Sequence, residues 1–246
     1  MKVVPKGVRS PAVWLLDLDD TLHDARTASM PHLHVSFGQY IQQHLRLTEA
    51  ESDALRRRYW LRYGATLLGL MRHHGVEPAH FLHHTHLLPG LEERVRGHRA
   101  DLQALARLPG RKVILTNAPA AYAARVLGVL GIGRLFERVV SIEDMHMFGQ
   151  LRPKPDARML RWVAARLGVA PSRCVLVEDT LQHQKSARRI GMGTAWMQRW
   201  LRPVAPAARH LVQAPGRPPQ PVRRLVAGRP AYVDRRIRRL GQLLRA

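Results

Sequence analysis

The sequence predicts an α/β fold: a parallel sheet with helices on both faces, into which a long all-helical segment is inserted. Two observations support this prediction. Short apolar runs of strand length alternate with segments of helical spacing over much of the chain, which is the pattern of a parallel sheet with crossover helices. This alternation is interrupted after the first apolar run by residues 25–108, which show helical spacing and no strand pattern.

The composition is that of a globular protein with an unusual charge. The 246 residues suffice for one large domain or for a core domain with a second one inserted, and 46% of them are hydrophobic. No run of about 18 apolar residues occurs, so we expect no membrane-spanning helix. One cysteine, Cys174, rules out an internal disulfide and fits a reducing compartment, so we expect a cytoplasmic protein.

The first predicted element is a buried strand over residues 13–18, and it ends in a cluster of carboxylates, Asp17, Asp19 and Asp20, followed by Thr21. Carboxylates crowded at the end of a buried strand repel one another and lose solvation, so such a cluster normally needs a cation. Oxygen ligands of this kind suit Mg²⁺, and a carboxylate held beside Mg²⁺ can attack phosphorus. The alternative is a turn with a helix N-cap, because Asp and Thr favour both.

Residues 23–108 are predicted to form an all-helical cap. This cap is inserted into a core that consists of residues 1–22 and 109–200. Its apolar residues recur at helical intervals. Three of its histidines, His80, His83 and His84, share one helix face at a spacing that can bind zinc. The alternative is a polar helix face in a histidine-rich stretch, and we favour it because no Cys or carboxylate completes a zinc site.

Strands return after this segment. They are predicted at residues 112–116, 138–141, 174–177 and 194–197, with helices at residues 118–130, 155–167 and 181–190. Strands that alternate with helices of this length predict a Rossmann-like parallel sheet with right-handed crossovers.

The composition changes after Trp200, where residues 201–246 predict a basic, Pro- and Arg-rich tail that is partly irregular. The apolar stripe within residues 234–244 predicts a terminal basic helix. The net charge is +22, and residues 197–246 contribute about half of the excess, with 12 Arg and one acid. Such a tail attracts polyanions, so nucleic acid is a candidate partner, although no aromatic residues are interleaved with the arginines.

Polar side chains follow the predicted strands. Ligands bind at the carboxyl ends of the strands in open parallel sheets, so these side chains share one edge. They are Asp17, Asp19, Thr21, Thr116, Asn117, Lys154, Glu178 and Asp179. Taken singly, each fits a turn, a loop or a helix cap. Together they supply a nucleophile, a metal site and ligands for phosphate oxygens, which are the requirements of metal-assisted phosphoryl transfer.

In this order the motifs resemble those of the haloacid dehalogenase superfamily. DLDDT is similar to its first motif, LTN to its second, Lys154 within RPKPD to its third, and EDT to its fourth. The resemblance covers about residues 13–197, and the helical insertion lies where that superfamily has its C1-type cap. The segments RYGATLLGLM and GRKVILTNA, and the residues around Thr85 and His86, are most similar to the pyrimidine 5′-nucleotidase branch.

The resemblance implies a role for each site residue. Asp17 would be the nucleophile, and Asp19 would be the general acid for the leaving alcohol and then the base for water. An Asp at position 19 argues against true haloacid dehalogenase chemistry, which needs no such acid. The resemblance also implies a Mg²⁺ site whose ligands are the Asp17 carboxylate, the Asp19 main-chain carbonyl and Asp179. Glu178 would lie beside this site or be a further ligand. The residues that would bind the phosphoryl oxygens are Thr116, Asn117 and Lys154.

One position departs from the pattern of that superfamily. Many of its members have Asn or Asp where this chain has His183. A histidine can still donate a hydrogen bond to a carboxylate ligand, so we expect activity to be retained.

We therefore expect a Mg²⁺-dependent phosphatase that acts on small phosphomonoesters through an aspartyl-phosphate, with nucleoside 5′-monophosphates such as pyrimidine nucleotides favoured by the resemblance. Two alternatives stay open. One is a phosphatase or phosphomutase for another small phosphorylated metabolite on the same fold. The other is binding of nucleic acid or another polyanion by the basic tail.

Overall fold

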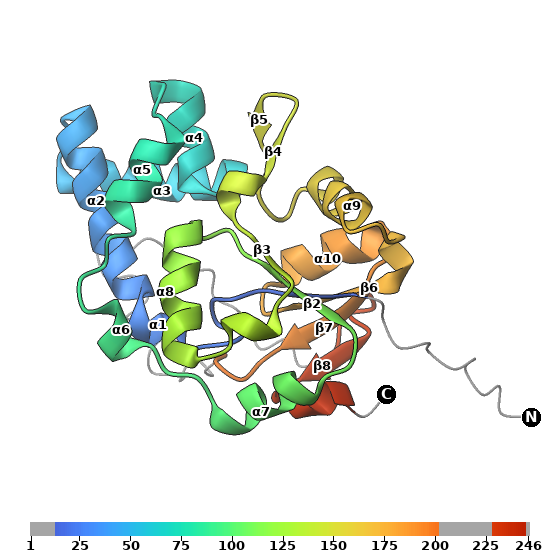
Figure 1. Cartoon of the computed structure of the whole chain (residues 1–246). Coiled ribbons are helices and arrows are strands. Elements are labelled where there is room, and N and C mark those ends of the chain that lie inside the picture. Colours follow the sequence, from blue (N-terminus) through green and yellow to red (C-terminus); the bar gives the residue numbers. More distant parts are fainter. Residues whose placement is uncertain (1–12, 202–227, 245–246) are drawn as a thin grey trace, which may run out of the picture. The chain divides into compact units, whose positions relative to one another are not determined.

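The computed structural model describes residues 13–201 and 228–244 (Figure 1). These residues form two compact units. The core unit contains residues 13–25, 95–200 and 228–244, and the helical unit contains residues 26–94 and Leu201. The sequence prediction ended the inserted segment at residue 108, whereas helix α7 (Arg99–Arg107) groups with the core unit.

The core unit is built on a six-stranded sheet in which all neighbouring strands are parallel, in the order β3-β2-β1-β6-β7-β8 (Figure 1). This confirms the predicted Rossmann-like sheet. The strands are β1 (Val13–Leu16), β2 (Arg111–Leu115), β3 (Arg138–Val140), β6 (Cys174–Glu178), β7 (Gly193–Met197) and β8 (Arg235–Ile237).

Helices connect these strands and surround the sheet. The connection from β2 to β3 runs toward one edge of the sheet, and the connection from β6 to β7 runs toward the other edge. Because such crossovers are right-handed, the helix between β2 and β3 and the helix between β6 and β7 lie on opposite faces. The helix before β6 packs against the one after it. These helices and the short 3₁₀ turns are α8 (Ala120–Leu130), η1 (Gly133–Leu135), η2 (Ile142–Asp144), α9 (Ala157–Arg166), η3 (Pro171–Arg173) and α10 (Leu181–Arg189).

Strand β1 lies inside the sheet, between β2 and β6, and its four side chains are all buried. Burial on both faces explains why its sequence is continuously apolar. Its last residue, Leu16, lies opposite Ile114 of β2 and Val177 of β6. Because the chain leaves β1 toward β2 and later crosses to β6 on the other side, the β1–β6 boundary is a topological switch point, where α/β sheets bind ligands.

The C-terminal residues correct one prediction. The apolar stripe of residues 234–244 predicted a helix, and this prediction is wrong: β8 adds to the sheet edge beside β7, and the 3₁₀ helix η6 (Leu240–Leu244) follows. Ile237 lies opposite Met197, and its carbonyl accepts a hydrogen bond of 2.8 Å from the Gln198 N–H. The end of the predicted tail therefore belongs to the core, while residues 202–227, including most of its prolines, lie outside the described residues.

A short antiparallel hairpin, β4 (His146–Met147) with β5 (Gln150–Leu151), was not predicted. Its two turn residues, Phe148 and Gly149, have φ angles of 50° and 71°. Two-residue hairpins favour such left-handed turns because their twist matches that of the strands. The hairpin leads directly into the loop that carries Lys154.

The helical unit contains no strand within residues 26–94. Its clearest start is that of α3, where Thr48 and Glu51 form a capping box. Gly69 of α4 permits close packing, because a Cβ there would lie 2.2 Å from the Tyr59 ring. No described helix is long and apolar enough to span a membrane. The helices between β1 and α7 are α1 (Ala25–Ala28), α2 (Met30–Leu45), α3 (Glu49–Tyr63), α4 (Thr66–His74), α5 (Pro78–Thr85) and α6 (Leu91–Arg94).

We predict that Ile237→Ala destabilises the protein by about 2–5 kcal/mol, the usual cost of truncating a buried Ile. The Ile237 side chain is 2% exposed and lies where β8 meets β7. The adjacent Arg236→Ala is the matched control, since Arg236 is exposed and surface changes usually cost within about 0.5 kcal/mol. Urea denaturation of both variants measures the difference, and equal stabilities would mean that β8 is not part of the folded core.

Candidate active site

Three buried carboxylates meet at the switch point of the sheet. Asp17 directly follows β1, and its N–H donates to the Val177 carbonyl of β6 at 3.0 Å. Glu178 ends β6, and Asp179 follows it. Carboxylate oxygens of the three residues lie within 4.8 Å of one another. The parallel pairing of β1 with β6 thus brings together residues that are far apart in the sequence.

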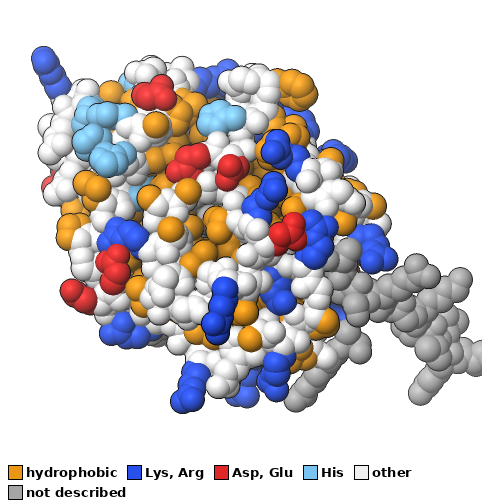
Figure 2. Space-filling view, viewed as in Figure 1, with side chains coloured by type: hydrophobic (Ala, Val, Ile, Leu, Met, Phe, Trp, Pro, Cys, Tyr) orange, Lys and Arg blue, Asp and Glu red, His pale blue; other side chains and the backbone are white. Residues whose placement is uncertain are grey.

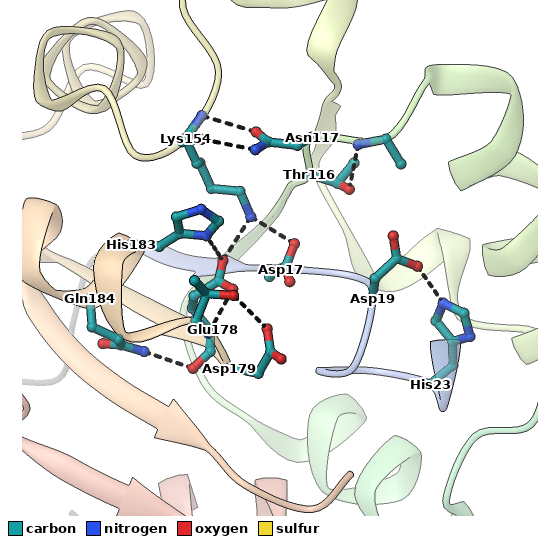
Figure 3. Close-up of polar contacts among 12 residues, drawn as sticks. Asp17, Asp19, His23, Thr116, Asn117, Lys154, Glu178, Asp179, His183 and Gln184 are labelled. Carbon is teal, nitrogen blue, oxygen red and sulfur yellow. Dashed lines mark hydrogen bonds and ion pairs between the residues drawn. The ribbon is translucent and has the colours of Figure 1, made fainter. Parts of the chain in front are cut away.

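The Lys154 ammonium lies among these carboxylates (Figure 3). Its Nζ donates to Asp17 Oδ1 at 2.7 Å and to Glu178 Oε2 at 2.8 Å. The Lys154 residue is only 3% exposed. A buried ammonium is tolerated only when it is paired and hydrogen-bonded, and here two carboxylates provide both.

The main chain of Lys154 is held by Asn117, which follows β2. The Asn117 side chain donates to the Lys154 carbonyl and accepts from the Lys154 N–H, both at 2.9 Å. Both ends of the Asn117 amide are thus engaged with this loop. The predicted role of Asn117 at phosphoryl oxygens stays a prediction, whereas its contact with the Lys154 loop is explicit in the structure.

The neighbouring Thr116 is buried at the end of β2, and its hydroxyl accepts a hydrogen bond from the Ala118 N–H at 3.0 Å. This contact closes the turn into α8. Thr116 therefore lies at the predicted edge of the sheet, next to the Asn117 that holds the Lys154 loop (Figure 3).

The end of β6 is held by the start of α10. Glu178 Oε1 accepts from the Thr180 N–H at 3.1 Å, and His183 Nδ1 lies 3.0 Å from Glu178 Oε2. The Gln184 side chain donates to the Glu178 carbonyl at 2.8 Å and also to the Ala195 carbonyl of β7. The structure thus places His183 beside a carboxylate of the cluster at ion-pair distance, while the expectation that activity tolerates a histidine here stays a prediction.

The charges of the cluster perturb one another. Burial, followed by the charge of Glu178, raises the pKa of Asp17 to about 8 even though Lys154 opposes the shift. Burial alone would raise the pKa of Glu178, but Lys154 and His183 outweigh it and hold this pKa below its usual range. Burial alone would lower the pKa of Lys154, but the two carboxylates outweigh it and raise the pKa. The ammonium therefore stays charged.

This arrangement fits a divalent cation. Asp17, Glu178 and Asp179 carry three negative charges when ionised, and Lys154 balances one of them. The formal charge of these four side chains is then −2, which the charge of Mg²⁺ would balance. Their ligand atoms are all oxygen, as Mg²⁺ prefers. The donor set therefore supports the predicted cation.

Asp19 has different surroundings from Asp17. Its Oδ1 accepts from the Tyr122 hydroxyl at 2.7 Å and lies 2.8 Å from His23 Nε2. A turn carries the chain away after Asp19, with Asp20 in the left-handed region at φ 55°. Neither partner of Asp19 was predicted from the sequence. His23 follows the first motif closely enough to have been noticed, whereas nothing in the sequence links Tyr122 to Asp19.

The histidines of the helical unit do not form a metal centre of the same kind. Among the described residues, the group formed by Asp17, Glu178 and Asp179 brings three potential metal-binding side chains within 4.8 Å, and no group containing a histidine does so. His80 instead contacts the Tyr40 hydroxyl through Nδ1 at 2.8 Å. Its ring packs against His84 at 4.2 Å between centroids.

A sequence model described as haloacid dehalogenase-like hydrolase matches residues 12–191. The chain belongs to the haloacid dehalogenase-like hydrolase family. The superfamily resemblance of the four motifs is thereby confirmed, while the C1-type cap and the pyrimidine 5′-nucleotidase branch stay predictions.

Several curated proteins are similar to this haloacid dehalogenase-like hydrolase. Pyrophosphatase PpaX of Bacillus velezensis is 33% identical over 69 residues, which cover 28% of this chain and 30% of that protein. Phosphate metabolism protein 8 of Saccharomyces cerevisiae is 22% identical over 193 residues, with coverages of 74% and 60%. Phosphoglycolate phosphatase of Escherichia coli is 30% identical over 95 residues, with coverages of 38% and 36%. The matches thus span less than two thirds of each relative.

Solved structures share the fold of this haloacid dehalogenase-like hydrolase. L-2-haloacid dehalogenase from Xanthobacter autotrophicus has a TM-score of 0.57 at 20% identity, covering 96% of this chain and 97% of that one. A HAD phosphatase from Thermococcus onnurineus has a TM-score of 0.58 at 18% identity, covering 96% of each chain. At such identities the likeness establishes the fold alone.

We predict that Asp17→Asn stabilises the cation-free protein increasingly as the pH rises. The pKa of Asp17 is raised from 3.8 to about 8, so between these values the folded state keeps a proton that the unfolded state has lost. The folding stability of the wild type therefore falls as the pH rises through this window. The amide of the Asp17→Asn variant does not titrate, so the variant does not lose this stability. We expect a gain above about 1.4 kcal/mol at pH 8, the equivalent of one pKa unit.

Urea denaturation in EDTA at pH 5, 6.5 and 8 measures this gain against the wild type. Glu77→Gln is the matched control, because it neutralises an exposed carboxylate of the helical unit. A stability difference between Asp17→Asn and wild type that stays constant across the three pH values would contradict the raised pKa.

Proposed function

We propose that this haloacid dehalogenase-like hydrolase is a Mg²⁺-dependent phosphatase. It would hydrolyse small phosphomonoesters through an aspartyl-phosphate formed on Asp17. The observation that carries the proposal is the Lys154 ammonium, bonded to Asp17 and Glu178 beside Asp179 at the switch point of the sheet. One nucleophilic carboxylate, one fixed positive charge and a cation-binding oxygen set are what phosphoryl transfer to a carboxylate requires.

Two cationic groups would bind the phosphate of the substrate. Bound Mg²⁺, held by Asp17, Asp179 and the Asp19 main-chain carbonyl, would neutralise charge on the transferring phosphoryl group. Lys154 would contact phosphoryl oxygens from its fixed position, together with Thr116 and Asn117. Because the ammonium is placed before substrate binds, little reorganisation is needed when charge develops in the transition state.

The reaction would proceed in two displacements. In the first, an Asp17 oxygen forms a bond to phosphorus while the bond to the leaving oxygen breaks, and Asp19 gives its proton to that oxygen. In the second, Asp19 takes a proton from water as the water oxygen bonds to phosphorus and the bond to Asp17 breaks. Proton transfer by a placed carboxyl group contributes about 10²–10⁴-fold to such reactions.

Nucleoside 5′-monophosphates are the substrates that we propose first. The support is the resemblance of segments in residues 62–71 and 110–118 to the pyrimidine 5′-nucleotidase branch. Curated relatives named as phosphatases support the broader class of small phosphorylated compounds. The chemistry follows from the core unit, whereas the preferred leaving group depends on residues that the motifs do not specify.

We expect the purified protein to release phosphate from members of a phosphomonoester panel only when Mg²⁺ is present. The panel contains UMP, AMP, phosphoglycolate and p-nitrophenyl phosphate. Asp17→Asn should reduce kcat to below a few per cent, because an amide cannot attack phosphorus. Absence of phosphate release from every ester with Mg²⁺ would disprove the proposed activity, and retained turnover by Asp17→Asn would disprove the nucleophile.

Asp19→Asn should affect substrates unequally. Loss of the general acid slows departure of a poorly acidic alcohol such as a nucleoside, whereas p-nitrophenolate leaves without a proton. We expect kcat/KM for UMP to fall about 10²–10⁴-fold and that for p-nitrophenyl phosphate to fall much less. Steady-state kinetics with both esters measures this, and equal losses would argue against Asp19 as the acid.

A further inference from the structure

Two buried side chains, those of His23 and Tyr122, converge on the carboxylate of Asp19, and Figure 3 shows the contact with His23. His23 is 0% exposed and Tyr122 is 1% exposed. Tyr122 Oη lies 2.7 Å from Asp19 Oδ1, His23 Nε2 lies 2.8 Å from the same oxygen, and the two partners lie 3.5 Å apart. A single carboxylate oxygen thus lies within hydrogen-bond distance of two buried groups. An ionised carboxylate can only accept, so His23 Nε2 is the donor when Asp19 is ionised.

The contact between His23 and Asp19 has a cost in free energy, because the other ring nitrogen of His23 is buried without a hydrogen bond to the described part of the chain. Among the described residues, His23 Nδ1 is buried and has no hydrogen-bond partner. A neutral imidazole donates through one nitrogen only, so donation from Nε2 to Asp19 leaves Nδ1 as a buried acceptor. An apolar side chain would avoid the cost, so the imidazole at this position calls for a reason other than packing.

The backbone holds the His23 ring in place. His23 forms β-bridges with Asp19 and with Gly97, and the neighbouring Asp24 N–H donates to the Arg96 carbonyl at 3.2 Å. Gly97 itself packs against the Leu130 side chain, since a Cβ there would lie 2.7 Å from Leu130 Cδ2. Both connections to the helical unit thus meet at His23, where the ring contacts Asp19.

Tyr122 is held in a different way. It lies in the first turns of α8, whose N-terminus follows the Thr116 turn. Tyr122 is buried, and its hydroxyl donates a hydrogen bond to Asp19 Oδ1. The two side chains therefore come from separate segments of the core unit, and both contact the same oxygen, Asp19 Oδ1.

We propose that His23 and Tyr122 are positioning residues, which orient the Asp19 carboxyl group for proton transfer to the leaving oxygen. This inference rests on the proposed phosphatase function. General acid catalysis needs the proton within hydrogen-bond reach of the leaving oxygen, so free rotation of the carboxyl group would lower its efficiency. Anchoring Oδ1 by two donors leaves the other oxygen of Asp19 in one fixed direction.

The test compares two esters that differ in their need for an acid, UMP and p-nitrophenyl phosphate, with Mg²⁺ present. The variants are His23→Leu, which removes the donor, and Tyr122→Phe, which removes only a hydroxyl and keeps the packing. We expect each to lower kcat/KM for UMP about 10- to 100-fold, a part of the 10²–10⁴-fold due to general acid catalysis. The value for p-nitrophenyl phosphate should change less than about threefold, because its leaving group needs no proton.

Two further variants separate positioning from a structural role. His23→Gln keeps an N–H donor near the position of Nε2 and should restore most of the UMP activity. Adding His23→Leu to Asp19→Asn should cause no further loss, because groups that act through one carboxyl group are not additive. Tyr232→Phe is the control for Tyr122→Phe, as it removes a tyrosine hydroxyl elsewhere in the core unit.

The outcomes are distinct. Selective loss on UMP with rescue by His23→Gln supports the inference. Equal loss on both esters by Tyr122→Phe and His23→Leu, or unchanged kinetics on UMP, overturns it while the phosphatase function stands. If the wild type hydrolyses AMP or phosphoglycolate but not UMP, that alkyl ester takes the place of UMP in the comparison. A wild-type protein that hydrolyses no ester of the four-member panel overturns the proposed function and this inference together.

Discussion

The buried ammonium of Lys154 is the interaction on which the site depends. It lies between Asp17 and Glu178, two carboxylates that would repel each other if both were ionised in the protein interior. This arrangement requires β1 and β6 to be neighbours, so that their carboxyl ends meet. It also requires the loop after β5 to reach the same edge, where Asn117 holds its backbone. Sheet order and site electrostatics are therefore coupled.

Two carboxylates that are two residues apart have acquired opposite surroundings. Asp17 faces an ammonium and further carboxylates, and it belongs to the oxygen set that suits a cation. Asp19 faces a phenol hydroxyl and an imidazole, which hold its orientation through Oδ1. Enzymes commonly separate the roles of like residues by environment. Here the separation comes from the turn after β1, which directs the second carboxylate toward α8 and the connection to the helical unit.

Parts of the fold that depend on local pattern were predictable. Strands β1, β2, β6 and β7 each contain a short run of mainly apolar, buried residues, because all four lie inside the sheet. Strand β8 was mistaken for a helix, because the spacing of Ile237, Leu240 and Leu244 is helical although the chain is extended at Ile237. The hairpin of β4 and β5 was missed, because strands of two residues carry too little periodicity to detect.

For this protein, the sequence by itself determined which chemical groups reach the sheet edge. Strand ends are marked locally by the change from apolar to polar residues, so Asp17, Asn117 and Glu178 were identifiable one by one. Only the tertiary structure decided which of them touch: Asn117 engages the Lys154 backbone, and Asp19 pairs with Tyr122. These two pairings join residues 37 and 103 positions apart, and no local pattern specifies them. They follow from strand order and loop geometry, because a hydrogen bond depends on the distance and direction that the whole fold imposes.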